Sequence, residues 1–202
     1  GPLLPALLRD LNFSYSEGGA VLFSAYIGFM VATLLTGVLA DAAGIKIVLL
    51  LAGLCLTVGL TAFSLVSSFW LLAAALFVVG LGLGSIEVGG NGLIVDLHQA
   101  NRGRYLNLLA VFHGVGAFIV PLYAAQLLST DFSWRQVYQF SIFLTVVLAS
   151  FFAVVKYPRA ASSREGMNLR TLFTAGFTRR MTWYYLFVAV YVAAEIGVAS
   201  WI

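Results

Sequence analysis

A glutamate and an asparagine stand in one of the most apolar stretches of the chain. The segment GLGLGSIEVGGNG, residues 80–92, contains Glu87 and, one helical turn later, Asn91. A charge at the middle of a membrane-spanning helix costs about 2.5–3.5 kcal/mol, so such a residue persists where it faces a cavity, finds a partner or takes up a proton. Because burial favours the neutral form of a carboxyl group, Glu87 can hold a proton and release it when its surroundings change. A permanently protonated Glu87, bonded to a neighbouring helix, is the alternative.

Two glycines and Asn91 extend the same helical face. Residues three or four positions apart are neighbours on a helix, so Gly80, Gly84, Glu87 and Asn91 form one stripe. The amide group of Asn91 offers donors and an acceptor, and it can bind a solute hydroxyl, orient the carboxyl group or join two helices. A glycine stripe leaves room for a solute or allows close packing of helices.

Three further residues in apolar segments are candidates for related chemistry. His113 can relay protons or bond a solute, and it can also be a packing histidine with one backbone bond. Glu195 is a second carboxyl group in an apolar segment, with a coupling role if it and Glu87 line one cavity. Trp201 can stack on a sugar ring, although tryptophan is also common at membrane interfaces.

A polar turn, GVLADAAGIK, interrupts the apolar sequence at residues 37–46. Gly37 can allow close approach of helices, and Gly44 can permit a tight turn. Asp41 can cap the following helix and accept hydrogen bonds from cations such as Lys46. The pattern indicates a helix hairpin with a charged connection.

The composition places these residues in a membrane protein. Of the 202 residues, 61% are hydrophobic and 9% are charged, whereas soluble domains average about 45–50% and about 25%. The mean hydropathy is +0.99. The single cysteine, Cys55, excludes an intrachain disulfide. Without a phosphate-binding loop, a Ser-His-Asp arrangement or metal-ligand spacing, the sequence favours neither an ATP-driven pump, an enzyme nor a metal site.

Apolar runs of about 20 residues predict the membrane spans. We expect an amino-terminal bundle over residues 1–156, an inter-half linker over 157–180 and the start of a seventh helix over 181–202. The expected spans of the bundle are about 1–8, 20–40, 45–66, 70–97, 105–128 and 137–155. We expect the first span to be cut at its start and the seventh at its end.

The distribution of cations predicts the orientation, because Lys and Arg are enriched in cytoplasmic loops. Arg9 and Arg135 lie on one side of the expected membrane, where Trp134 and Arg135 are expected to open the sixth span as an interfacial anchor. The other cations lie on the opposite side: Lys46, Arg102, Arg104, Lys156, Arg159, Arg164, Arg170, Arg179 and Arg180. The amino terminus and the loop at 156–180 are therefore expected in the cytoplasm, and Arg102 and Arg104 are candidates either to reach Asp41 or to anchor the membrane surface.

The G-x-x-x-D-x-x-G-x-K pattern of residues 37–46 resembles the signature of the major facilitator superfamily. The resemblance implies a 12-helix fold, of which this all-α chain would be the six-helix amino-terminal bundle and part of the seventh helix. It also implies that Asp41 joins a cytoplasmic charge cluster that gates the outward-open state. Ala42 and Ile45 depart from the pattern, since basic residues are common there.

Two further patterns resemble the fucose permease-like sugar and proton symporters. These are E-V-x-x-N at Glu87 to Asn91 and N-x-x-x-x-F-x-G-x-G-x-x-x-x-P at Asn107 to Pro121. The end YVAAEIGVASWI, with Glu195 and Trp201, resembles the start of that subgroup's second half. The resemblance implies proton-driven uptake of a sugar or small polar metabolite.

We therefore expect a secondary transporter in the plasma membrane, or in the inner membrane of a bacterium. The expected partners are the solute, the bilayer and a carboxy-terminal half, with no nucleic acid. No cofactor is expected besides the proton gradient. An exporter of drugs or amphipathic compounds and a non-transporting receptor on the same fold remain alternatives, and the solute and the coupling ion remain open.

Overall fold

The structure is a computed structural model that describes residues 3–130, 132–157 and 179–201, with side chains in the last helix described at 181–194. The described residues form helices and turns and contain no strand, which confirms the expected all-α fold. The helices are α1 (Leu4–Leu11), α2 (Tyr15–Ala43), α3 (Ile45–Leu65), α4 (Phe69–Leu97), η1 (Gln99–Asn101), α5 (Arg102–Ser129), α6 (Trp134–Val154) and α8 (Arg179–Trp201).

The chain divides into two compact units, and each is described by itself. The described residues 3–130 and 132–157 form the bundle of α1 to α6, whereas α8 belongs to the other unit. Most of the expected linker at 157–180 lies outside the described residues. Its role as a cytoplasmic linker stays a prediction.

Two helices begin earlier than their apolar runs because polar residues cap them. At the start of α2, Ser14 Oγ accepts from the Glu17 amide over 3.3 Å, and Glu17 Oε2 accepts from the Ser14 amide over 2.8 Å. Ser133 and Gln136 form the same capping box at the start of α6. Each box satisfies amide groups that the first helical turn leaves without partners. These helices therefore begin at Tyr15 and Trp134, before the expected spans at about 20 and about 137, and the bounds of the spans stay predictions.

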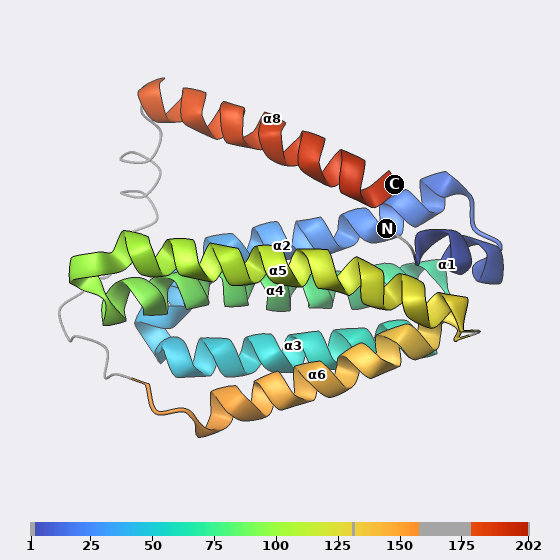
Figure 1. Cartoon of the computed structure of the whole chain (residues 1–202), viewed down its shortest axis with the longest axis horizontal. Coiled ribbons are helices and arrows are strands. Elements are labelled where there is room, and N and C mark those ends of the chain that lie inside the picture. Colours follow the sequence, from blue (N-terminus) through green and yellow to red (C-terminus); the bar gives the residue numbers. More distant parts are fainter. Residues whose placement is uncertain (1–2, 131, 158–178, 202) are drawn as a thin grey trace. The chain divides into compact units, whose positions relative to one another are not determined.

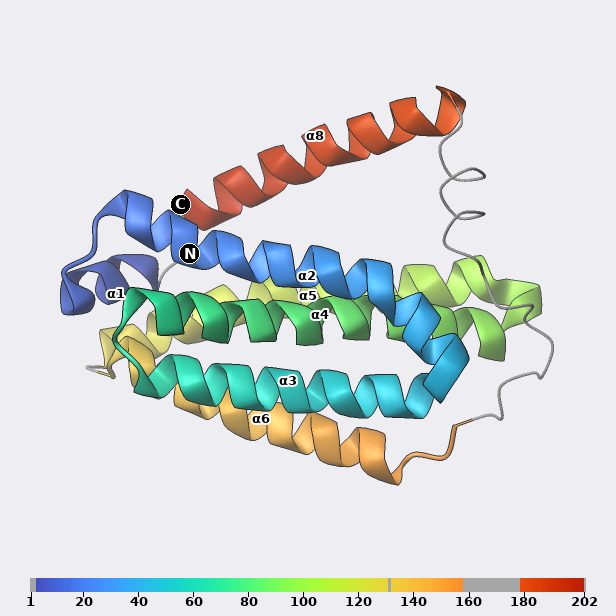
Figure 2. The same ribbon diagram turned by 180° about the vertical axis from the view of Figure 1, so that it is seen from behind.

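The bundle has α4 at its centre. It packs most extensively against α2 and α3, and α3 also packs against α6. Figure 2 shows α4 between α2 and α3, while Figure 1 shows α5 and α6 on the opposite side of the bundle. The α2–α3 and α4–α5 connections lie at one end, with the end of α6. We call this end the basic end, because Lys46, Arg102 and Arg104 lie there.

Glycines bring α2 and α4 into backbone contact. A Cβ atom at Gly80 would overlap the carbonyl oxygen of Ala25, and a Cβ atom at Gly28 would overlap that of Phe77. Ser24 Oγ also donates to the Ala73 carbonyl across this interface, over 2.8 Å. Small residues allow membrane helices to approach this closely. The α2–α4 pair is therefore a tightly packed part of the bundle.

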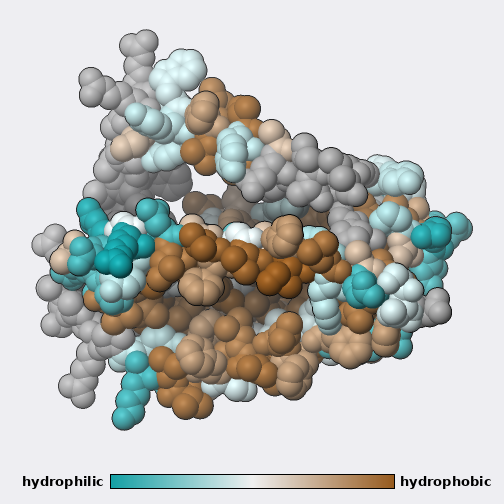
Figure 3. Space-filling model, viewed as in Figure 1, coloured by the Kyte–Doolittle hydropathy of each residue, from teal (hydrophilic) through white to brown (hydrophobic). Residues whose placement is uncertain are grey.

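Apolar side chains cover much of the surface of the bundle. Among the residues that the structure describes, five helices are long and apolar enough to cross a membrane, namely α2, α3, α4, α5 with its preceding turn, and α6. Figure 3 shows a broad hydrophobic band over α5 and α6, with hydrophilic residues gathered toward the two ends of the bundle. A spanning helix satisfies its own backbone hydrogen bonds, so it presents only its side chains to the lipid. Apolar side chains on that surface suit a bilayer. The chain is a multi-pass membrane protein.

Candidate functional site

Glu87 and Asn91 are joined by a hydrogen bond on α4. The Nδ2 atom of Asn91 donates to Glu87 Oε1 over 3.2 Å. Within the bundle, Glu87 is exposed and Asn91 is half-buried. Because the donor stands one turn from the carboxylate, it restricts the orientation of the Glu87 side chain. The structure thus brings together the two residues whose spacing predicted a shared face.

The stripe that contains these residues has two different environments. Gly80 and Gly84 are buried, and a Cβ atom at Gly84 would lie 2.6 Å from the Phe29 carbonyl oxygen of α2. At Gly90 and Gly92, by contrast, an added Cβ would meet no heavy atom of the described chain within 4 Å. The glycines before Glu87 therefore serve close packing against α2. Beyond Glu87, α4 has open space at Gly90 and Gly92 but still packs on α3 at Gly89, where an added Cβ would lie 3.2 Å from Ile45 and Leu49.

His113 lies in α5, on a helix with little burial. Of the residues of α5, all of which the structure describes, only Ala124 is buried. His113 is exposed, so it does not fill the interior of the bundle as a packing histidine would. The hydrogen bonds found among the described residues do not join it to Glu87 or Asn91. Its membership of the same site stays a prediction.

The polar turn at residues 37–46 differs from its expected geometry at two positions. Gly44 has φ 86° and ends α2, as a tight turn requires. The expectation that Asp41 caps the next helix is wrong, because α2 continues through Ala43 and the N-cap residue of α3 is Gly44, with no side-chain cap. An added Cβ at Gly37 would meet no heavy atom of the described residues within 4 Å, so Gly37 makes no close helix contact there.

The cations expected around Asp41 are exposed at the basic end. Lys46 is in the first turn of α3, and Arg102 and Arg104 are in the first turn of α5, which begins at 102 instead of about 105. A helix carries negative partial charge at its carboxyl end and positive partial charge at its amino end. Asp41 lies at the carboxyl end of α2, and the two arginines lie at the amino end of α5, so each side chain is repelled by the partial charge of its own helix end. An attraction between Asp41 and the arginines would offset both repulsions.

The remaining candidates lie on α8. The helix includes the positions of Glu195 and Trp201, but their side chains lie outside the described residues. Their roles in coupling and solute binding stay predictions. Among the described residues, no group of His, Cys, Asp and Glu could hold a metal ion.

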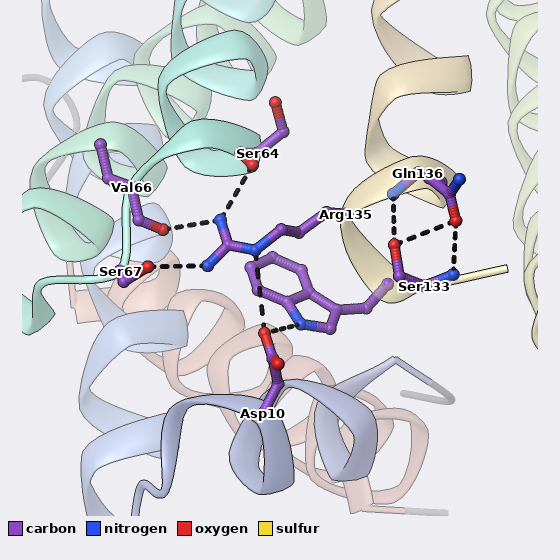
Figure 4. A network of polar contacts seen from close by, with 8 residues as sticks. Asp10, Ser64, Val66, Ser67, Ser133, Arg135 and Gln136 are labelled. Atoms are coloured by element: carbon purple, nitrogen blue, oxygen red, sulfur yellow. Dashed lines mark hydrogen bonds and ion pairs between the residues drawn. The ribbon is translucent and has the colours of Figure 1, made fainter.

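A polar cluster at the other end of the bundle was not predicted. Arg135, at the start of α6, bonds the end of α3 and stands beside Asp10 of α1, as Figure 4 shows. Trp134 was expected to be an interfacial anchor, and that interpretation is wrong because this side chain is only 3% exposed. One signal was present in the sequence: Arg135 lies on the side where cations are rare, and Asp10 lies on that same side.

Comparison with known proteins relates the whole chain to one family. The family model described as Major Facilitator Superfamily matches residues 1–202. The chain is 29% identical over 124 residues to sodium-dependent glucose transporter 1 of Rattus norvegicus, covering 61% of this chain and 26% of the relative. It is 28% identical over 134 residues to the niacin transporter NiaP of Acinetobacter baylyi, covering 66% and 30%. It is 31% identical over 121 residues to the uncharacterized MFS-type transporter YcaD of Escherichia coli, covering 59% and 32%.

These relatives are considerably longer than the matched region. The chain spans about a quarter of the length of the glucose transporter relatives that it matches. The family match, in contrast, extends over all of the residues that carry the described helices. With its all-α bundle and its apolar spanning helices, the chain belongs to the major facilitator superfamily.

Proposed function

We propose that the chain is part of a secondary active transporter that couples the uptake of a sugar or small polar metabolite to protons. The observation that carries this proposal is the hydrogen-bonded pair of Glu87 and Asn91 on an exposed face of a spanning helix. An ionisable group facing lipid would be costly, so this face is better explained by a hydrated pathway in the whole protein. Alternating access would then expose Glu87 to each side of the membrane in turn.

Each candidate residue has a role in this mechanism. Glu87 carries the proton, and Asn91 orients its carboxyl group and offers hydrogen bonds to a solute hydroxyl. His113 is a second solute ligand. Glu195 and Trp201 extend the pathway in the carboxy-terminal half, as a further coupling carboxylate and a surface on which a sugar ring can stack. The proton gradient drives the cycle without a cofactor.

The basic end is assigned to the cytoplasm and to the gate. Lys46, Arg102 and Arg104 gather there, as the enrichment of cations in cytoplasmic loops predicts. Attraction between Asp41 and the arginines would hold the ends of α2 and α5 together in the outward-open state, offsetting the unfavourable helix-end charges. The protein would lie in the plasma membrane, or in the inner membrane of a bacterium.

The relatives bear on the solute and on the coupling ion. Two of them are named for glucose and for niacin, which supports a small solute. The glucose relative is named as sodium-dependent, so Na⁺ is the competing coupling ion. Uptake driven separately by a proton gradient and by a sodium gradient distinguishes the two ions.

The test uses the full-length protein in proteoliposomes and the variant Glu87→Gln. We expect the variant to lose gradient-driven accumulation of the solute by at least tenfold while it retains solute exchange, because glutamine keeps the hydrogen bond but cannot release a proton. The matched control is Glu17→Gln, in which the α2 capping box persists because α6 uses glutamine at the same position.

Two results would contradict the proposal. Unchanged proton-driven accumulation by Glu87→Gln would remove Glu87 from the coupling mechanism. Solute movement only out of vesicles, with lipophilic cations competing better than sugars, would instead identify an exporter.

A further inference from the structure

Arg135 donates hydrogen bonds to the carboxyl end of α3. Its Nη1 atom donates to the carbonyl oxygens of Ser64 and Val66, each over 2.9 Å, and its Nη2 atom donates to Ser67 Oγ over 2.9 Å. The last carbonyl groups of a helix lack intrahelical partners, and the negative partial charge there attracts a cation. The planar fork of a guanidinium group suits these three acceptors better than a lysine ammonium group does.

The same arginine connects α6 and α3 to α1. Arg135 Nε lies 3.7 Å from Asp10 Oδ2, and Trp134 Nε1 donates to that same oxygen over 2.9 Å. The Arg135 guanidinium also lies 4.4 Å from the centre of the Trp134 ring, within the range of a cation–π interaction. Figure 4 shows Asp10 of α1 below the Arg135 side chain. Three helix ends thus share one polar cluster, which we call the three-helix clamp: Asp10, Ser64, Val66, Ser67, Trp134 and Arg135.

Phe63 and Tyr138 pack against Trp134 of the clamp. Phe63 of α3 is 0% exposed, and its ring meets Trp134 edge to face at 5.7 Å and Tyr138 at 4.9 Å. The apolar core around them includes Leu7 and Leu8 of α1. Separation of these helix ends would expose aromatic surface and leave backbone carbonyl groups without partners. Opening of the clamp is therefore energetically costly.

We propose that the three-helix clamp holds the ends of α1, α3 and α6 together throughout the working cycle, so that these ends move as one body. A gate would need a contact that opens at low cost. Here 24% of the Arg135 side chain and 54% of the Asp10 side chain are accessible, and the pair adjoins two aromatic rings that are at most 3% exposed, those of Phe63 and Trp134. Conformational change must then occur elsewhere, such as at the basic end.

The first test measures thermal unfolding of the full-length protein in detergent. We expect Arg135→Ala to lower the unfolding temperature by about 5 °C or more, because several charge-assisted hydrogen bonds are lost together. Arg135→Lys should lower the unfolding temperature by more than half of the Arg135→Ala effect, because lysine cannot reach the three acceptors together. The matched control is Arg9→Ala at the same end, since Arg9 bonds the Pro5 carbonyl within its own helix. Equal effects of Arg135→Ala and Arg9→Ala would overturn the proposal.

The second test asks whether the clamp opens. Asp10→Cys and Arg135→Cys, placed together in a Cys55→Ser background, can be joined by a reducible bifunctional thiol reagent. We expect the bridge to restore the unfolding temperature and leave solute transport at half the wild-type rate or more. Transport that is blocked by the bridge and returns on reduction would show a gate and overturn the proposal. Absence of transport in the wild type would count against the proposed function and not against the clamp. The unfolding temperatures of Arg135→Ala and Arg9→Ala would then decide whether the clamp holds the three helix ends together.

Discussion

Substitution of Gly80 by alanine should weaken the contact between α2 and α4. The added Cβ would overlap the Ala25 carbonyl oxygen and lie 2.9 Å from the Phe29 amide nitrogen, so the two backbones must separate. Overpacking of this kind costs about 1–3 kcal/mol, with the upper end expected here because a backbone atom cannot rotate away. Alanine recovers about 1 kcal/mol through its higher helix propensity. We expect a net loss of about 2 kcal/mol in the free energy of unfolding.

Gly90→Ala and Gly92→Ala are the matched controls on the same helix. An alanine Cβ at either position meets no described atom within 4 Å, so helix propensity alone should raise the free energy of unfolding by about 0.5–1 kcal/mol. Unfolding of the full-length protein in mixed detergent micelles, followed by circular dichroism, measures these differences. If Gly80→Ala is as stable as Gly92→Ala, the backbone contact between α2 and α4 is not as described.

Two further predictions concern the cap of α6 and the orientation of the chain. Ser133→Ala removes the acceptor of the Gln136 amide and should cost about 1 kcal/mol, or about 2–4 °C in unfolding temperature. Ser150→Ala, near the carboxyl end of α6, removes only a bond to the Val146 carbonyl and should cost much less. In intact cells, an impermeant thiol reagent should label Arg9→Cys but not Lys46→Cys, because cations gather in cytoplasmic loops; labelling of Lys46→Cys alone would reverse the orientation.

The sequence predicts the helices well, because a spanning helix makes its hydrogen bonds within itself. The expected spans at 45–66 and 70–97, cut from the apolar runs at charges and turn residues, lie within one residue of the ends of α3 and α4. α2 and α6 begin before the expected spans because their polar first turns lie outside the apolar runs. The S-x-x-E pattern at Ser14 and Glu17 was a local signal for the start of α2.

The sequence predicted the roles of two residues wrongly. Asp41 was assigned to the start of α3, but α2 continues two residues beyond it and Gly44 makes the turn. Trp134 was assigned to the membrane interface, where tryptophan is common, but it packs against Phe63. Its partner Asp10 is 124 residues away in the chain, and no local pattern indicates such a pairing.

The sequence by itself determined the apolar helices and the shared face of Glu87 and Asn91, because both follow from the local period of an α-helix. The tertiary structure alone decided that Gly80 and Gly84 pack against α2 while Glu87 stays exposed. It alone also brought Asp10 to Arg135. The physical reason is that a helix specifies which residues share a face, whereas the packing of its neighbours determines which part of that face is covered.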